Sequence, residues 1–310
     1  MIGEKQKGIG AILSANVIYG LNIPVTKALV AHWMTPMAYT MTRMIFGAII
    51  FWGVGSFLKT EKVQPKDMLV FLIGGLMGFL GTQFLFSLSL EFTTPVVFSL
   101  IVSMAPVVVF LLSVIFLKEA VSFRKRIGIM LSISGAALII LLGSRQQEQG
   151  TNNTLGILFA ILCVFLYSGY LMLTRKISIK YQPVTIAKWM FLFSSLTVLP
   201  FSFSALPDQK IYSAETTGLA IALLAFALFF STTLAFFLLP VALKRLEAST
   251  VSTFMNVQPI VASVVAILVG QDTLTWDKPL AVILVLTGVY LVSTRPKSKR
   301  GIYLRLQNRK

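Results

Sequence analysis

The sequence predicts an all-α polytopic membrane protein of ten transmembrane helices, arranged as two inverted five-helix repeats. Three observations predict this fold: the composition, the long apolar runs, and an internal repeat. Of the 310 residues, 56% are hydrophobic and only 12% are charged, whereas charged residues make up about 25% of an ordinary soluble domain. Lipid is therefore the solvent for most of the surface.

Ten apolar runs have about 17–25 residues each, the length that a helix needs to cross a bilayer. They lie at 8–30, 35–58, 68–90, 95–117, 124–143, 154–174, 184–204, 217–239, 249–270 and 276–294. The loops between them are short and hold polar and turn residues. The expected units are an N-terminal repeat (1–143), a linker (144–153), a C-terminal repeat (154–294) and a basic cytoplasmic tail (295–310).

The second half of the chain repeats a pattern of the first. With a shift of 153 positions, an in-span proline and serine, an acid after that span, an aromatic residue and a later glycine all find counterparts. The pairs are Ser99–Ser252, Pro106–Pro259, Glu119–Asp272, Phe123–Trp276 and Gly135–Gly288. Paired, proline-interrupted segments in two halves point to the substrate site of a secondary transporter.

Lysine and arginine residues predict the orientation. With the N-terminus in the cytoplasm, 22 of the 27 fall in inner loops or tails and three in outer loops, while Lys27 and Arg43 lie within spans. This positive-inside bias places both termini in the cytoplasm. Because each half has an odd number of spans, the second half enters the membrane from the opposite side. The repeat is then inverted, which is the arrangement that supports alternating access.

Two segments carry a family resemblance, "SLSLEFTTPVVFSLIVSMAPVVVFLLSVIFLKEAVSFRKRIGIMLSISGAALIILLG" and "LPVALKRLEASTVSTFMNVQPIVASVVAILVGQDTLTWDKPLAVILVLTGVYLVS". They share a mid-helix proline, an acid at the helix end and an in-span glycine. Over residues 8–294 the chain resembles the EamA-like branch of the drug/metabolite transporter superfamily. The Gly-Glu usual there is Lys118-Glu119 in the first half and Gln271-Asp272 in the second. The resemblance implies a carrier of small organic solutes, with export as the usual direction.

The residues needed for catalysis or metal binding are missing from the spans. His32 is the single histidine, and all eleven Asp and Glu residues fall in loops, tails or span ends. We therefore expect no enzyme, no metal site and no activated nucleophile. Without a glycine-rich phosphate loop, we also expect no ATP site and no cofactor. The net charge of +16 lies where membrane topology places it, so nucleic acid is not an expected partner.

Polar and aromatic residues within the spans are the candidates for substrate binding. Tyr19, Asn22 and Thr26 fall at helical spacing on the first span, with Asn16 close by, and such a face is expected to look inward rather than to lipid. For any single candidate, packing between helices is the alternative. The candidate set is Asn16, Tyr19, Asn22, Arg43, Gln83, Ser103, Tyr167, Tyr170, Phe236, Asn256 and Gln258.

Pro106 and Pro259 are expected to break their helices near the middle of the membrane. A proline lacks the N–H of the helical ladder and its ring clashes with the preceding turn. Ser103 lies beside the first proline, and Asn256 and Gln258 beside the second. Kinks without function are the alternative, since neighbouring helices in a membrane can satisfy the freed backbone groups.

Arg43 is the sharpest single candidate. It lies roughly 12 Å below the start of its span at about 1.5 Å per residue, within reach of the midplane of a core about 30 Å thick. Two roles stay open. In the structural role Arg43 extends to the outer surface or pairs with Glu91; in the functional role it receives a substrate carboxylate. Lys27 lies about one turn from the outer end of its span and can extend to the surface.

These observations predict an inner (plasma) membrane carrier that moves a small organic solute, such as an amino acid, by alternating access. A multidrug or toxic-compound efflux carrier, a passive channel and a non-transporting scaffold are the alternatives. Expected partners are the small-molecule substrate and the lipid bilayer, and a homodimer stays open. The expected cavity is lined by spans 8–30, 68–90, 95–117, 154–174, 217–239 and 249–270.

Overall fold

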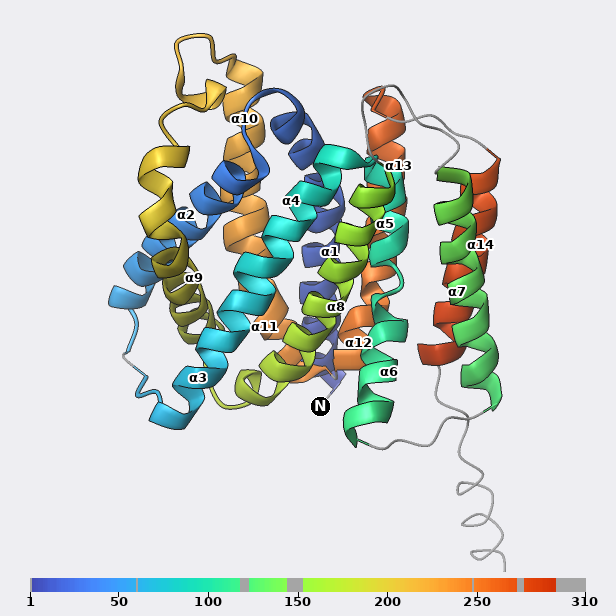
Figure 1. Ribbon diagram of the computed structural model, residues 1–310. Helices are drawn as coiled ribbons and strands as arrows, with labels where there is room; N and C mark the ends of the chain where they lie inside the picture. Colours follow the sequence, from blue (N-terminus) through green and yellow to red (C-terminus); the bar gives the residue numbers. More distant parts are fainter. Residues whose placement is uncertain are drawn as a thin grey trace, which may run out of the picture.

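The computed structural model describes residues 2–59, 61–117, 123–143, 153–246, 248–271 and 276–293. The acids Glu119 and Asp272, all of the linker except Asn153, and the basic tail fall outside the described residues. Within these ranges the regular structure is helical, and the long helices run side by side (Figure 1). The elements are α1 (Ile2–His32), α2 (Pro36–Ser56), α3 (Pro65–Gly74), η1 (Gly75–Gly81), α4 (Thr82–Phe92), α5 (Pro95–Val102), α6 (Ala105–Leu117), α7 (Phe123–Gly143), α8 (Asn153–Ser178), α9 (Pro183–Ala205), η2 (Lys210–Tyr212), α10 (Gly218–Phe226), η3 (Ala227–Ala235), α11 (Phe236–Arg245), α12 (Ala248–Thr253), η4 (Phe254–Asn256), α13 (Val257–Leu268) and α14 (Asp277–Ser293).

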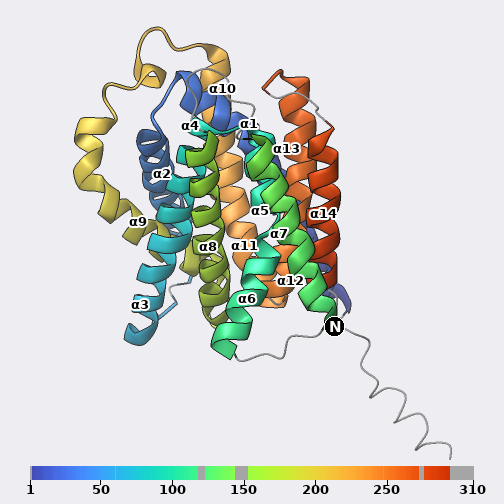
Figure 2. The same ribbon diagram turned by 45° about the vertical axis from the view of Figure 1, so that its right-hand side comes forward.

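Among the described residues, eight helices are long and apolar enough to cross a membrane. Each overlaps one predicted span. The two other predicted spans are helical as α7 and α14, which pack along one another at one side of the bundle (Figure 2). The eight helices cover Gly3–His32, Pro36–Ser56, Pro65–Phe92, Pro95–Leu112, Asn153–Ser178, Pro183–Ala205, Gly218–Arg245 and Thr250–Leu268.

Proline and threonine set the starts of several helices. Helices α2, α3, α5 and α9 begin with proline, whose fixed φ and missing N–H suit the first helical turn. Before α2 and α5, the side-chain oxygens of Thr35 and Thr94 each accept a backbone N–H at 3.3 Å. These caps satisfy donors that the first turn leaves free.

Both predicted helix breaks are present. Helix α5 ends at Val102 and α6 begins at Ala105, with a turn directly before Pro106. In the second half, the 3-10 turn η4 separates α12 from α13 directly before Pro259. Each break therefore lies in the turn where the proline removes a helical hydrogen bond.

Two π-helical segments interrupt long helices, and the sequence reading did not predict them. Segment η1 lies between α3 and α4, and η3 lies between α10 and α11. A shift of 153 positions places Gly75–Gly81 on 228–234, inside η3. Hydroxyl groups bond carbonyls five residues back: Thr82 to Met77 and Thr232 to Ala227, both at 2.8 Å. Segments of this kind are rare and occur often at functional sites.

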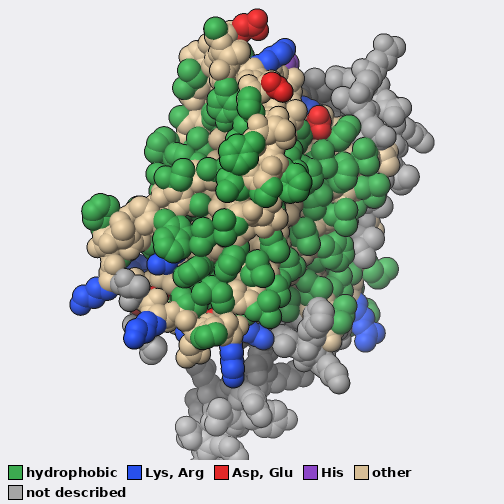
Figure 3. All heavy atoms as spheres, turned by 60° about the vertical axis from the view of Figure 1, so that its left-hand side comes forward, with side chains coloured by type: hydrophobic (Ala, Val, Ile, Leu, Met, Phe, Trp, Pro, Cys, Tyr) green, Lys and Arg blue, Asp and Glu red, His purple; other side chains and the backbone are tan. Residues whose placement is uncertain are grey.

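The surface has the layered charge pattern of a membrane protein. In Figure 3 hydrophobic side chains form a broad band, most of the visible Lys and Arg lie at its lower end, and its upper end carries Asp, Glu and the histidine with fewer Lys or Arg. Helix α1 begins at the lower end (Figure 1). With its apolar helices, this pattern makes the chain a multi-pass membrane protein.

Candidate functional site

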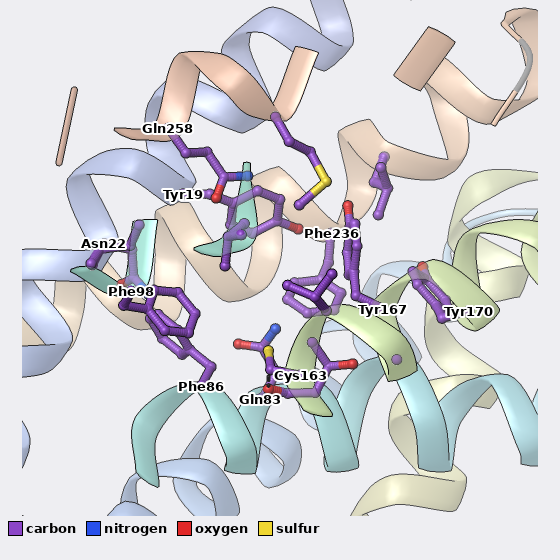
Figure 4. A pocket seen from close by; sticks show the side chains of 17 residues that line it. Tyr19, Asn22, Gln83, Phe86, Phe98, Cys163, Tyr167, Tyr170, Phe236 and Gln258 are labelled. Carbon is purple, nitrogen blue, oxygen red and sulfur yellow. Dashed lines mark hydrogen bonds between the residues drawn. The ribbon is translucent and has the colours of Figure 1, made fainter. Parts of the chain in front are cut away.

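A cavity lies inside the bundle and is open on one side. Its empty volume, including the solvent space at the opening, is about 620 Å³. Its lining comes from α1, η1, α4, α5, α8, α11, η4 and α13 (Figure 4). These elements belong to the six spans from which the sequence predicts a cavity. Seven of the eleven candidate residues lie in the lining, namely Tyr19, Asn22, Gln83, Tyr167, Tyr170, Phe236 and Gln258.

The polar face of α1 looks inward, as its spacing predicts. Asn16, Asn22 and Thr26 are each at most 2% exposed. Asn22 donates through Nδ2 to Thr26 Oγ1 at 3.2 Å, and Thr26 Oγ1 lies 2.9 Å from the Tyr39 hydroxyl. The stripe therefore joins α1 to α2 behind the cavity while Asn22 remains part of its wall.

Four candidates lie outside the lining. Asn16 lies behind Gln258, whose Nε2 donates to Asn16 Oδ1 at 2.6 Å. Ser103 donates back to the Leu100 carbonyl at 2.6 Å, within the broken turn. The side-chain oxygen of Asn256 is buried without a partner among the described residues. Arg43 is the fourth, and Pro106 and Pro259 also lie outside the lining and shape only the helices that carry it.

Arg43 is fully buried between two helices and a π-helical segment. Its Nε donates to Thr232 Oγ1 at 2.7 Å, one terminal nitrogen donates to Gln83 Oε1 at 2.5 Å, and the other donates to Ser231 Oγ at 3.1 Å. The guanidinium carbon also lies 5.3 Å from the centre of the Tyr39 ring. Neutral acceptors thus hold the cation at depth, because several hydrogen bonds can replace an acid partner.

The structural alternative that Arg43 extends to the surface or pairs with Glu91 is wrong. The side chain has no exposed area, and its hydrogen bonds run to α4 and η3 instead. Glu91 is exposed at the end of α4. Lys27, by comparison, donates to the Leu90 carbonyl at 2.8 Å, in the last turn of α4. A cation at that position satisfies a terminal carbonyl and complements the helix dipole.

Aromatic rings form much of the remaining cavity wall. Tyr19 meets Phe236 edge to face with ring centres 6.0 Å apart, and Tyr167 lies 5.9 Å from Tyr170. In Figure 4 the Tyr19 and Tyr167 side chains enter the space from different helices, and the Gln83 amide points into it from α4. The walls therefore offer apolar faces with polar groups at a few places, as ligand pockets usually do.

One polar atom in the lining clearly lacks a partner among the described residues. It is the side-chain oxygen of Asn22, a side chain that is almost completely buried. A buried polar atom without a hydrogen bond costs about 1–3 kcal/mol. Unpartnered atoms of this kind in a cavity wall are the places where a ligand or an ordered water gains the most.

Sequence reasoning missed the apolar part of the wall. Phe86 and Phe98 line the cavity and face each other with ring centres 5.1 Å apart. Cys163 also lines it and donates to the Thr82 carbonyl at 3.4 Å. These residues lie within apolar spans, where nothing distinguishes a cavity wall from ordinary packing. Only a map of helix neighbours could have found them.

The lining offers few polar side-chain groups other than amides and hydroxyls. The side chains of its lining carry no ionisable acid or base except tyrosine and cysteine. Among the described residues, no cluster of three or more His, Cys, Asp or Glu is arranged to hold a metal ion. Hydrogen-bonding amides and hydroxyls set among aromatic rings can bind and orient a small solute.

Comparison with known proteins identifies relatives along almost the whole chain. An "Uncharacterized transporter" of Archaeoglobus fulgidus is 25% identical over 266 residues, covering 84% of this chain and 90% of the relative. "Uncharacterized transporter YetK" of Bacillus subtilis is 24% identical over 301 residues, covering 95% and 89%. "Uncharacterized inner membrane transporter YhbE" of Escherichia coli is 23% identical, covering 83% and 80%.

One crystal structure matches this chain with a TM-score of 0.60 and 19% identity, over 90% of this chain and 98% of its own. At that identity the match shows a shared fold alone. The sequence model of the EamA-like transporter family matches the chain twice, at residues 6–141 and 154–294. With both halves of the chain covered, this membrane protein belongs to the EamA-like transporter family.

Proposed function

We propose that this protein is a secondary carrier that moves a small organic metabolite, such as an amino acid, across the inner membrane by alternating access. The observation that carries the proposal is the cavity, whose lining is drawn from spans of both halves of the chain. It combines aromatic walls with amides and hydroxyls in an otherwise apolar bundle. A scaffold would not need such a polar interior, because polar groups inside a membrane are costly.

The proposed architecture is ten spans in two inverted halves. The family model matches each half separately. Two further features support the repeat at the same shift of 153 positions, namely the proline breaks at α5–α6 and η4–α13 and the π-helical segments η1 and η3. In a repeat of this kind, one half rocks against the other around the shared cavity.

The proposed orientation has both termini in the cytoplasm. It rests on the lysine and arginine bias and on the basic end of the surface (Figure 3), which is the end where α1 begins (Figure 1). Outward transport is the direction that the family resemblance suggests. The name of the Escherichia coli relative, an inner membrane transporter, supports the proposed membrane.

A counterflow assay tests the proposal. Purified protein is reconstituted in liposomes, and uptake of a labelled metabolite is measured with and without the same unlabelled metabolite inside. A carrier is accelerated by substrate on the far side, because the loaded site returns faster than the empty one. Counterflow of metabolites supports the proposal, while counterflow only of bulky hydrophobic drugs favours a multidrug carrier. Uptake that is the same with and without unlabelled metabolite inside the liposomes indicates a channel and refutes the carrier proposal.

A further inference from the structure

Two chains of hydrogen-bonded side chains determine which hydrogen-bonding atoms the cavity presents. Gln83 on α4 and Gln258 on α13 both belong to its lining. An amide side chain offers a donor at its nitrogen and an acceptor at its oxygen, so its function depends on which end is turned inward. For each glutamine, a buried residue outside the lining settles this choice.

Arg43 settles the orientation of Gln83. A guanidinium group has donors and no acceptor, so the Gln83 atom 2.5 Å from Arg43 must be the oxygen. Thr232 and Ser231 fix Arg43 itself from η3. The Gln83 amide nitrogen is left without a partner among the described residues, on a side chain that points into the cavity (Figure 4). Gln83 therefore faces the cavity as a donor.

Asn16 settles the orientation of Gln258 in the opposite sense. The Ile12 carbonyl can only accept, so Asn16 must turn its Nδ2 toward that carbonyl, at 2.9 Å. Asn16 Oδ1 then faces Gln258 and accepts from its Nε2 at 2.6 Å. The remaining polar atom of Gln258 is its oxygen, an acceptor. Asn22 adds a second acceptor on this side of the cavity, because its buried Oδ1 is unpartnered among the described residues.

We propose that Arg43 and Asn16 are positioning residues that give the cavity a fixed polarity, with a donor on the α4 side and acceptors on the α1–α13 side. This inference rests on the proposed transport function and narrows its substrate class. The matching solute carries a carboxylate or carbonyl group toward Gln83 and an N–H donor, such as an ammonium group, toward Gln258. Its apolar part packs against the aromatic walls.

The charge of Arg43 acts through Gln83 and not by direct contact with the solute. Arg43 has no exposed area and is outside the cavity lining. Its hydrogen bond polarises the Gln83 amide, because bonds in a chain strengthen one another where the dielectric constant is low. Gln83 is then a better donor to a carboxylate than an unassisted amide.

Three related compounds test the polarity. Leucine carries both polar groups, 4-methylpentanoate lacks the ammonium group, and 3-methylbutylamine lacks the carboxylate. Their dissociation constants are measured by calorimetry on the purified full-length protein. Gln83→Glu keeps the shape and still pairs with Arg43 but removes the donor. We expect this variant to bind leucine and 4-methylpentanoate about tenfold or more weakly, as loss of a charge-assisted hydrogen bond implies. It should still bind 3-methylbutylamine.

The second glutamine gives the reciprocal result. Gln258→Leu removes the acceptor, so the binding of leucine and 3-methylbutylamine should weaken, while the affinity for 4-methylpentanoate should not change. Equal losses of all three compounds in either glutamine variant would overturn the fixed polarity. The test does not require Arg43 variants to fold, because Gln83→Glu and Gln258→Leu alone decide it.

The affinity for 4-methylpentanoate divided by the affinity for 3-methylbutylamine distinguishes a positioning role of Arg43 from a merely structural role. In Arg43→Gln the new amide can donate or accept, so Gln83 can turn over and the preference for 4-methylpentanoate should fall. Arg43→Lys keeps a pure donor and should restore the preference. Lys27→Gln is the matched control, because this in-span cation bonds the Leu90 carbonyl, and the ratio should not change. An unchanged ratio in folded Arg43→Gln would overturn the positioning role.

Failure of this inference can be told apart from failure of the proposed function. If none of the three compounds binds, yet the protein shows counterflow of another metabolite, the polarity is wrong and the carrier stands. If no metabolite shows counterflow, the proposed function falls first.

Discussion

Gly78 in η1 lies in the wall of the cavity, and replacing it with alanine tests how closely η1 packs against α8. Built onto Gly78, a Cβ atom would lie 2.2 Å from Cδ2 of the Tyr170 ring. The ring cannot easily move away. It is fully buried and lies against Phe79 and Tyr167, with ring centres 5.8 and 5.9 Å away.

The structure sets the size of the expected effect. Forcing an extra carbon into a packed interior costs typically about 1–3 kcal/mol, and the contact at Gly78 is far inside normal van der Waals distance. Gly53 on α2 offers the matched control, since nothing lies within 4 Å of its added Cβ. The gain in helix propensity from glycine to alanine applies at both positions and cancels in the comparison. The two variants should therefore differ by about the packing cost, about 1–3 kcal/mol.

Unfolding of the purified protein in mixed micelles, titrated with a denaturing detergent, measures this difference. Gly78→Ala should be less stable than Gly53→Ala and should also lower counterflow, because the ring it displaces lines the cavity. Adding Tyr170→Leu should recover part of the loss, as expected for two residues in contact. Equal stability of the two alanine variants would refute the close packing of η1 on α8.

Three further outcomes are expected. A cysteine at Asn152 should react with a membrane-impermeant maleimide in intact cells, and one at Lys62 only after permeabilisation; the opposite pattern would overturn the proposed orientation. Pro106→Ala and Pro259→Ala should each insert normally yet lower counterflow, since alanine restores the helical ladder; full activity in both would reduce the breaks to ordinary kinks. Cys163, the single cysteine, is 4% exposed in the lining, so wild type should react slowly in detergent, and a transported metabolite should slow it further. Labelling that is indifferent to such a metabolite would argue that Cys163 lies away from the site.

The features that the sequence predicts well are those with a local physical cause. A proline removes a hydrogen bond wherever it stands, so the breaks before Pro106 and Pro259 follow from the residue itself. The polar face of α1 follows from spacing, because lipid disfavours Asn16 and Asn22 on an outer surface. Apolar length alone also places the helices, whose bounds agree with the predicted spans to within several residues.

Other features depend on partners that are distant in the chain. The hydrogen bonds of Arg43 reach Gln83, 40 residues away, and Thr232, 189 residues away, and no spacing rule connects such positions. The π-helical segments also lack a common composition. Gly75–Gly81 contains three glycines, whereas Ala227–Ala235 contains none. Their likeness is one of position in the fold, so a pattern read along the sequence cannot detect it.

The two chains of hydrogen-bonded side chains around Gln83 and Gln258 have one further property in common: each includes residues from both halves of the protein. Gln258 belongs to the second half and is oriented by Asn16 of the first. Gln83 belongs to the first half and is oriented by Arg43, which Ser231 and Thr232 of the second half hold in place. If one half rocks against the other, as proposed, these bonds are strained or broken together with the cavity wall. The polarity that recognises a solute would then exist only while the halves are docked in this arrangement, so release of the solute and movement of the halves would be the same event.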